Sequence, residues 1–200
     1  MDAYLPATEL QTPRQLLPSF YRQYQLGDDG GQSSSYVKVE LTKKLFVYFP
    51  NFDARRKAVF KHDVHHIVTG YPSTLKGETE IGAWEIASGC RHYWVAFVLD
   101  LHGVMMGLLF NPLGIYKAFV KGRRTKNLYN DALPDKQVMD TPIAEIRERL
   151  LLNNYSGKGN LIDMALFLLL LLFGVVYSVL SIVLLLPVLF YTVYVMATKK

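Results

Sequence analysis

Two histidines and two carboxylates near the middle of the sequence have the residue types and spacing of metal ligands. These residues are His62, Asp63, His66 and Glu78. Residues four apart on a helix lie about 6 Å apart at Cβ, so the rings of His62 and His66 can reach one ion. At about 100° per residue, Asp63 lies at the edge of the same helix face, whereas His65 points away from it. We therefore expect His65 to be a supporting or surface residue and the other four residues to bind the ion.

Eleven residues separate Glu78 from His66, and Glu78 lies at the start of the next expected helix. A short antiparallel return places its carboxylate opposite the histidine pair. A mixed nitrogen and oxygen ligand set suits one divalent ion, with zinc first and iron or manganese as alternatives, better than calcium or copper(I). Asp63 and Glu78 are also candidates for proton transfer. A hydrogen-bonded helix pair without metal remains the alternative interpretation.

The second helix carries a stripe of small and polar residues beyond Glu78. At helical spacing, Gly82, Glu85, Gly89 and His92 lie on one face. This stripe predicts the floor of a substrate-binding groove, in which Glu85 and His92 orient a ring. Close helix packing through the two glycines explains the same pattern equally well.

The surrounding sequence predicts an all-α fold that positions these residues. Asp53 is a suitable N-cap, and a glycine with a proline two residues later ends the first metal-binding helix. Residues 37–49 fit an extended segment or a helix. The expected helices cover residues 14–24, 54–69 and 78–110, the last with a break at Gly103, and another begins at Pro142. The expected organisation is an N-terminal segment and loop (1–35), a helical domain (36–155) and an apolar tail (161–198).

The tail predicts a membrane-embedded element. Residues 164–198 form a run of thirty-five residues without a charge. A single helix of that length extends about 52 Å, against a hydrocarbon core of about 30 Å. The sequence therefore favours a helical hairpin that turns near residues 177–181, with one long helix as the alternative. Lysines before and after the tail place both of its ends on the cytoplasmic side, and a buried core hairpin is the less favoured explanation.

Composition narrows the setting of the chain. The 200 residues carry a net charge of +5 that is spread along the sequence, without the basic and aromatic clusters of nucleic-acid-binding proteins. The lone cysteine, Cys90, allows no internal disulfide and fits a reducing compartment. No secretory signal is recognisable at the N-terminus. We expect a bacterial inner-membrane protein with its helical domain on the cytoplasmic side and no nucleic-acid partner.

The motif His62-Asp63-x-x-His66, followed by eleven residues and Glu78, resembles the signature of the coenzyme Q (ubiquinone) biosynthesis protein 4 family. The segments Gly122-Arg123-Arg124-x-Lys126 and 140–150 are similar to the basic stretch and the closing helix of that family. The resemblance covers about residues 35–153. An apolar tail is not usual for the family.

The resemblance implies an all-helical protein at the membrane where ubiquinone is made, with the four motif residues as ligands of one metal ion. It further implies handling of a polyprenylated hydroxybenzoate precursor, with removal of the ring carboxylate and hydroxylation at that carbon. A role in organising the other ubiquinone-biosynthesis proteins is also implied. Two alternatives are a non-catalytic scaffold that binds prenyl lipids and a membrane zinc metallohydrolase with Asp63 as its base.

Overall fold

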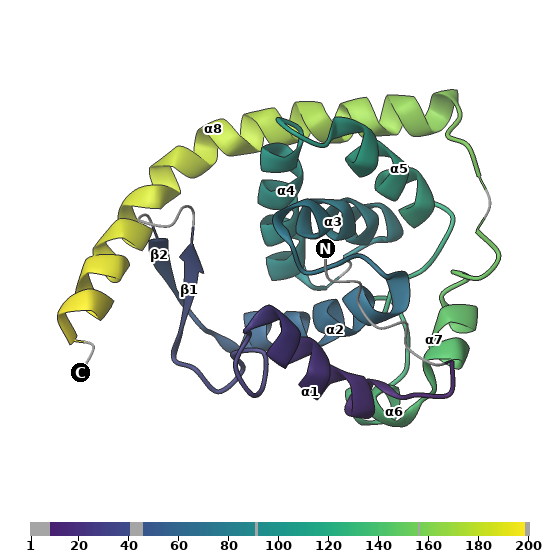
Figure 1. The fold of residues 1–200 in the computed structure, drawn as a ribbon. Coiled ribbons are helices and arrows are strands. Elements are labelled where there is room, and N and C mark those ends of the chain that lie inside the picture. Colours follow the sequence, from purple (N-terminus) through teal and green to yellow (C-terminus); the bar gives the residue numbers. More distant parts are fainter. Residues whose placement is uncertain (1–8, 41–45, 91, 156, 199–200) are drawn as a thin grey trace.

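The computed structural model describes residues 9–40, 46–90, 92–155 and 157–198, without the side chains of residues 39–40 and 182–185. Over these ranges the protein is mostly helical, as predicted, with a two-stranded sheet near the N-terminus (Figure 1). The elements in chain order are α1 (Pro13–Tyr24), β1 (Tyr36–Glu40), β2 (Phe46–Pro50), α2 (Asp53–Thr69), α3 (Leu75–Ser88), α4 (Trp94–Gly107), α5 (Pro112–Gly122), α6 (Asp135–Asp140), α7 (Ile143–Arg149) and α8 (Leu161–Thr198).

The ends of α2 and α3 follow from local sequence. Gly70 ends α2 in the left-handed conformation at φ 78°, which glycine adopts without strain, and its N–H donates to the His66 carbonyl oxygen at 3.0 Å. Thr74 caps α3, because its hydroxyl oxygen accepts a hydrogen bond from the Gly77 N–H at 3.3 Å. The predicted N-cap Asp53 is instead the first residue of α2, and Phe52 occupies the cap position.

Helix α3 lies between α4 and α5 and provides the centre of one hydrophobic core (Figure 1). Trp84 is fully buried there, and its indole N–H donates to the hydroxyl oxygen of Thr125 at 2.8 Å. Val104 of α4 and Ile115 of α5 pack against the same cluster, and Phe167 of α8 joins it. The core thus connects the helix that carries Glu78 to the apolar tail.

A second hydrophobic core holds α2 in place from the opposite side. Phe20 of α1 packs with Val64 and Ile67 of α2, and with Ile143 and Ile146 of α7. Val64 and Ile67 are completely buried, so one face of α2 is fixed by packing. The remaining faces of α2 are directed toward α3 and α4.

The expected single helix over residues 78–110 is wrong. The chain ends α3 at Ser88 and begins α4 at Trp94, whereas Gly103 lies inside α4. Gly89 has φ 99°, and its carbonyl oxygen accepts hydrogen bonds from the side-chain amide of Asn127 at 3.1 Å and from that of Asn130 at 2.5 Å. These contacts come from about forty residues along the chain, so local periodicity could not reveal them.

Residues 37–49 and the segment after Pro112 also bear on the sequence predictions. Residues 37–49 include the two strands of an antiparallel hairpin, in which Lys38 pairs with Tyr48. Pro112 begins α5 instead of only ending the preceding helix, because proline is well accommodated in the first helical turn. Helix α6 was not anticipated.

The tail forms one continuous helix of 38 residues, so the favoured hairpin is wrong and the long-helix alternative holds. Its first part, Leu161–Ser181, has a mean hydropathy of 2.5 and is long and apolar enough to span a membrane. Helix α8 arches over the domain from α5 and α4 toward β2, with Pro187 inside it (Figure 1). The segment 177–181, where the hairpin was expected to turn, is helical, and Gly174 allows close contact with Met105 of α4.

Candidate metal centre

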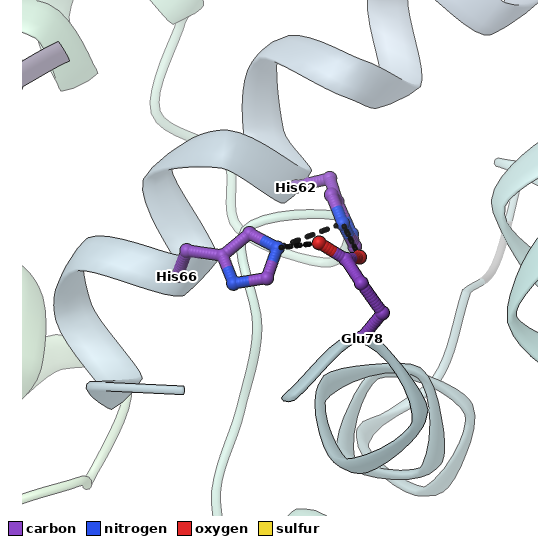
Figure 2. A group of neighbouring side chains, drawn as sticks. All are labelled: His62, His66 and Glu78. Atoms are coloured by element: carbon purple, nitrogen blue, oxygen red, sulfur yellow. Dashed lines mark hydrogen bonds and ion pairs between the residues drawn. The ribbon is translucent and has the colours of Figure 1, made fainter. Parts of the chain in front are cut away.

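His62 and His66 of α2 and Glu78 of α3 point toward one another (Figure 2). The two histidines lie on successive turns of α2, and Glu78 lies in the first turn of α3. Gly77 permits this position, because a Cβ there would clash with the carbonyl oxygen of Pro72. The tight 70–74 connection therefore brings Glu78 directly opposite the histidine pair.

The three side chains form a compact set of ligand atoms. The Nε2 atoms of His62 and His66 lie 3.1 Å apart. One carboxylate oxygen of Glu78 lies 3.2 Å from His62 Nε2, and the other lies 3.2 Å from His66 Nε2. The hydroxyl of Ser73 donates to Glu78 at 2.5 Å and helps to fix the carboxylate.

The other ring nitrogens determine which tautomers these histidines adopt. His66 Nδ1 lies 2.8 Å from the Tyr71 carbonyl oxygen, which can only accept, so Nδ1 carries the proton. His62 Nδ1 lies 3.0 Å from a carboxylate oxygen of Glu85 and is assigned as a donor for the same reason. In the neutral rings both Nε2 atoms are then acceptors, as are the oxygens of Glu78. Such a group of acceptors is satisfied either by a second proton on one of the rings or by a cation between them.

The geometry of this group fits a tetrahedral divalent ion. Metal–nitrogen distances of about 2.0–2.1 Å at tetrahedral angles separate neighbouring ligand atoms by about 3.3 Å. The two Nε2 atoms are 3.1 Å apart, close to that value, and each lies 3.2 Å from a different oxygen of Glu78, so either oxygen is near enough to share an ion with them. Two histidines and one carboxylate leave the fourth position open, as in catalytic zinc sites. His66 is buried, whereas the Glu78 side chain is 39% exposed, so the open position can be reached from solvent.

The pKa shifts of His62 and Glu78 also favour a positive charge at this site. Burial alone would lower the pKa of His62, but the carboxylates of Glu85 and Glu78 raise it well above the ordinary value. Burial opposes ionisation of Glu78, yet His62 and His66 hold the pKa of its carboxyl far below the usual range. A proton on His62 and a divalent ion are therefore alternative ways of satisfying the same atoms, and metal binding releases that proton.

Asp63, the fourth predicted ligand, is not part of this close group. Its carboxylate is buried on the flank of α2 and accepts a hydrogen bond from the Tyr21 hydroxyl of α1 at 3.0 Å. Gly30 also lies against this carboxylate. Burial raises the pKa of Asp63 to about 6, against the opposing effect of His62 and His66. The helix places Asp63 next to the ligands in sequence but directs its carboxylate toward α1.

Behind the ligands lies a buried network that the sequence did not reveal. Glu85 has no solvent exposure, and one of its oxygens accepts from Nδ1 of both His62 and His65, at 3.0 and 2.6 Å. The Tyr129 hydroxyl donates to the other oxygen at 3.2 Å. Asp100 also lies within reach of Glu85, and burial together with that neighbouring charge raises the pKa of Asp100 well above its ordinary value.

His65 is accordingly an interior residue that supports the site, and the surface position considered for it is wrong. Its Nε2 accepts a hydrogen bond from the backbone N–H of Leu128 at 2.9 Å, so its Nδ1 is the donor to Glu85. One signal in the sequence could have indicated the network. Asp100 is an isolated acid in an otherwise apolar stretch, which is typical of a buried carboxyl with a polar partner.

The predicted substrate stripe does not line one groove. A Cβ on Gly82 would lie 3.2 Å from Cα of Asp100, so Gly82 allows close packing of α3 on α4. Gly89 ends α3, and Glu85 is enclosed behind His62. His92 is exposed and lines a separate cavity of about 590 Å³. These contacts favour the packing interpretation that the sequence left open.

The basic stretch at 122–126 has a structural contact of its own. Arg123 and Arg124 bind the buried carboxylate of Asp163 at 2.9 and 2.6 Å, which fixes the start of α8 beside the end of α5.

In comparisons with known proteins, the chain matches no protein-family model, no curated protein and no solved structure. The interpretation of the site therefore rests on the chain's own residues and their geometry.

Proposed function

We propose that this chain is a membrane-associated metalloprotein that acts on a polyprenylated hydroxybenzoate precursor of ubiquinone and removes the ring carboxylate. The observation that carries the proposal is the group formed by His62, His66 and Glu78, whose ligand atoms lie 3.1–3.2 Å apart with the ring protons assigned elsewhere. The resemblance of the motif to the coenzyme Q biosynthesis protein 4 family supplies the substrate class. A zinc ion is the preferred occupant, with iron or manganese as alternatives.

A bound divalent ion supplies Lewis acidity toward a phenolate or carboxylate oxygen of the ring. The chain's part is to hold the ligands and the substrate and to manage the proton. His62 and His66 are fixed in one tautomer by Glu85 and by the Tyr71 carbonyl. Loss of carbon dioxide leaves an electron pair on the ring carbon, which must receive a proton. Asp63 can hold a proton, because burial raises its pKa to about 6, but its carboxylate faces Tyr21, so the proton reaches the ring from solvent.

The apolar tail supports a location at a membrane. A prenylated ring combines a polar head with a long apolar chain, so its binding site must lie near lipid. Helix α8 provides an apolar surface attached to the same core as α3. We propose the bacterial inner membrane, with the helical domain on the cytoplasmic side and other ubiquinone-biosynthesis proteins as partners.

The structure bears on the two alternatives differently. A metallohydrolase with Asp63 as general base is disfavoured, because that carboxylate faces Tyr21 of α1 and not the ligand group. A non-catalytic scaffold that binds prenyl lipids is compatible with the fold. It differs in its prediction, because a scaffold tolerates loss of the metal ligands but not loss of α8.

The test is made in cells that lack the native gene and carry either wild-type or variant chains. Lipid extracts are analysed by mass spectrometry for ubiquinone and for prenylated hydroxybenzoate. His66→Ala should abolish ubiquinone and accumulate the carboxylated precursor, whereas His102→Ala, an exposed histidine on α4, should behave as wild type. Normal ubiquinone in His66→Ala cells would reject the catalytic role. Normal ubiquinone in cells without the gene would reject the assignment altogether.

A further inference from the structure

Among its described side chains, α8 faces the rest of the protein with one stripe, which contacts α4 and α5 in the first half of the helix and β2 near its end. The buried residues Asp163, Phe167, Gly174, Thr192 and Val195 fall within an arc of about 80° at helical spacing. Phe167 contacts Phe119 of α5, with 5.2 Å between the ring centroids. The buried residues of the tail thus lie on the side that touches protein, and the opposite side consists largely of aliphatic and aromatic residues.

Both ends of this stripe are fixed to the domain by polar contacts. At the first end, Asp163 accepts hydrogen bonds from Arg123 and Arg124. Near the other end, the Thr192 hydroxyl oxygen accepts a hydrogen bond from the Tyr48 N–H of β2 at 2.9 Å. These two attachment points are separated by about 44 Å of helix. Helix α8 is therefore held against the domain over more than the thickness of a bilayer core, which is about 30 Å.

A helix held in this way cannot cross the bilayer alone. The domain beside it carries charged side chains near both attachment points, including Lys38 on β1 and Lys117 on α5. A perpendicular α8 would bring this charged surface into the hydrocarbon region, which is unfavourable. The docked arrangement is compatible with a membrane only if α8 runs along the surface.

The outward face of α8 has the character of a lipid-contacting surface. Leu168, Leu172, Val179, Phe190 and Val193 are each more than half exposed. A monomeric soluble protein rarely exposes so continuous an apolar surface.

Cationic groups lie beside the start of α8, where the helix packs on α5. Lys117, Lys121 and Lys158 line one pocket of about 510 Å³. Tyr116 lines the same pocket, and its ring lies 5.3 Å from that of Phe167 on α8. Ammonium groups at the edge of an apolar surface are placed to meet anionic lipid headgroups.

We propose that α8 lies parallel to the membrane plane, with its outward face immersed in a single leaflet that contains anionic phospholipids, and that it does not cross the bilayer. The helical domain is held flat on that surface, and both ends of the tail remain on the same side. This inference concerns topology and does not depend on the chemistry of the metal site.

The experiment measures the depth of three outward positions in the full chain. Leu169, Leu180 and Val193 have similar exposures of 60, 63 and 65%. Each is changed to Cys in a Cys90→Ala background, labelled with a fluorophore and reconstituted into vesicles of phosphatidylcholine and phosphatidylglycerol. Quenching by lipids that carry spin labels at different depths gives the position of each label. The expected result is that all three labels lie in the outer part of one leaflet, no deeper than about 5–10 Å below the headgroup boundary, with differences set by the arch of α8.

Two other topologies give different depth profiles. A spanning helix separates positions 169 and 193 by about 36 Å along its axis. A membrane hairpin places position 180 far deeper than the other two positions. Either profile would overturn the proposal, as would the absence of lipid quenching at all three positions.

A matched inner position tests whether the helix stays docked on the domain. Val195 is 4% exposed, whereas Val193, two residues earlier, is 65% exposed. The label at Val193→Cys should be quenched by lipid, and the label at Val195→Cys should be shielded. Equal quenching at both positions would show a helix surrounded by lipid and would reject the in-plane arrangement. Circular dichroism of each variant establishes that the chain is folded.

Discussion

Replacement of Glu85 by Gln tests whether the buried network controls metal binding. Glu85 has no solvent exposure, and it receives hydrogen bonds from His62, His65 and the Tyr129 hydroxyl. Glutamine has nearly the same shape and can still accept the two imidazole hydrogen bonds through its amide oxygen. The substitution therefore removes the negative charge and leaves the packing in place.

The size of the effect follows from the hydrogen bond between His62 Nδ1 and Glu85, at 3.0 Å. A hydrogen bond to a charged group contributes about 1.5–3 kcal/mol, and a neutral one contributes about 1 kcal/mol. Loss of the charge therefore weakens the hydrogen bond that orients His62 by about 1.4 kcal/mol. This corresponds to an affinity for zinc that is about tenfold lower. This estimate lies at the lower end of the 10–100-fold reported for partners of metal-ligating histidines.

The assay is a competition titration of the purified chain against a zinc-chelating dye, which gives the dissociation constant for zinc. Glu80→Gln is the matched control, because Glu80 lies on the same helix and interacts with Asn111 and Lys76 instead of with the histidines. Zinc binding by Glu85→Gln that equals wild type would refute the argument that the negative charge of Glu85 supports metal binding through His62. Equal weakening in both variants would point to a nonspecific effect of charge.

Three further predictions concern packing and ligand identity. Phe167→Ala should lower the free energy of unfolding by about 3 kcal/mol in chemical denaturation, because the buried ring joins the core; Leu168→Ala, at a 55% exposed position, should change it little. Gly82→Leu should lower the melting temperature, because the leucine side chain would clash with the α4 backbone. A normal melting temperature would mean that Gly82 lines an open groove, as the sequence predicted. Asp63→Asn should retain zinc in elemental analysis, because its carboxylate faces Tyr21; loss of zinc would make Asp63 a ligand after all.

Local sequence signals predicted the elements whose ends depend on nearby residues. Gly70 and the following turn ended α2 where expected, and the periodic segment at 14–24 became α1. The break between α3 and α4 was missed, because it depends on Asn127 and Asn130 binding the Gly89 carbonyl from a distant part of the chain. The tail was misread as a hairpin because its length was compared with a bilayer alone, and not with the domain surface that it covers.

The candidate site was predictable to the extent that it depends on spacing within one helix and across one short loop. His62 and His66 share a face because they are four residues apart, and Glu78 follows from the tight loop before α3. Asp63 was assigned to the same face because a helical projection does not show that Tyr21 of α1 binds that side chain. The role of Glu85 required knowledge of how α3 faces α2.

The most direct measurement of the central claim is the divalent metal content of the purified full chain, determined by elemental analysis after dialysis against trace zinc. The ligand geometry predicts about one ion for each wild-type chain and almost none for His62→Ala or His66→Ala. His102→Ala should hold as much metal as wild type, because this histidine lies on α4 with its Nδ1 bonded to Val98. A wild-type chain without bound metal, or histidine variants that retain it fully, would contradict the account.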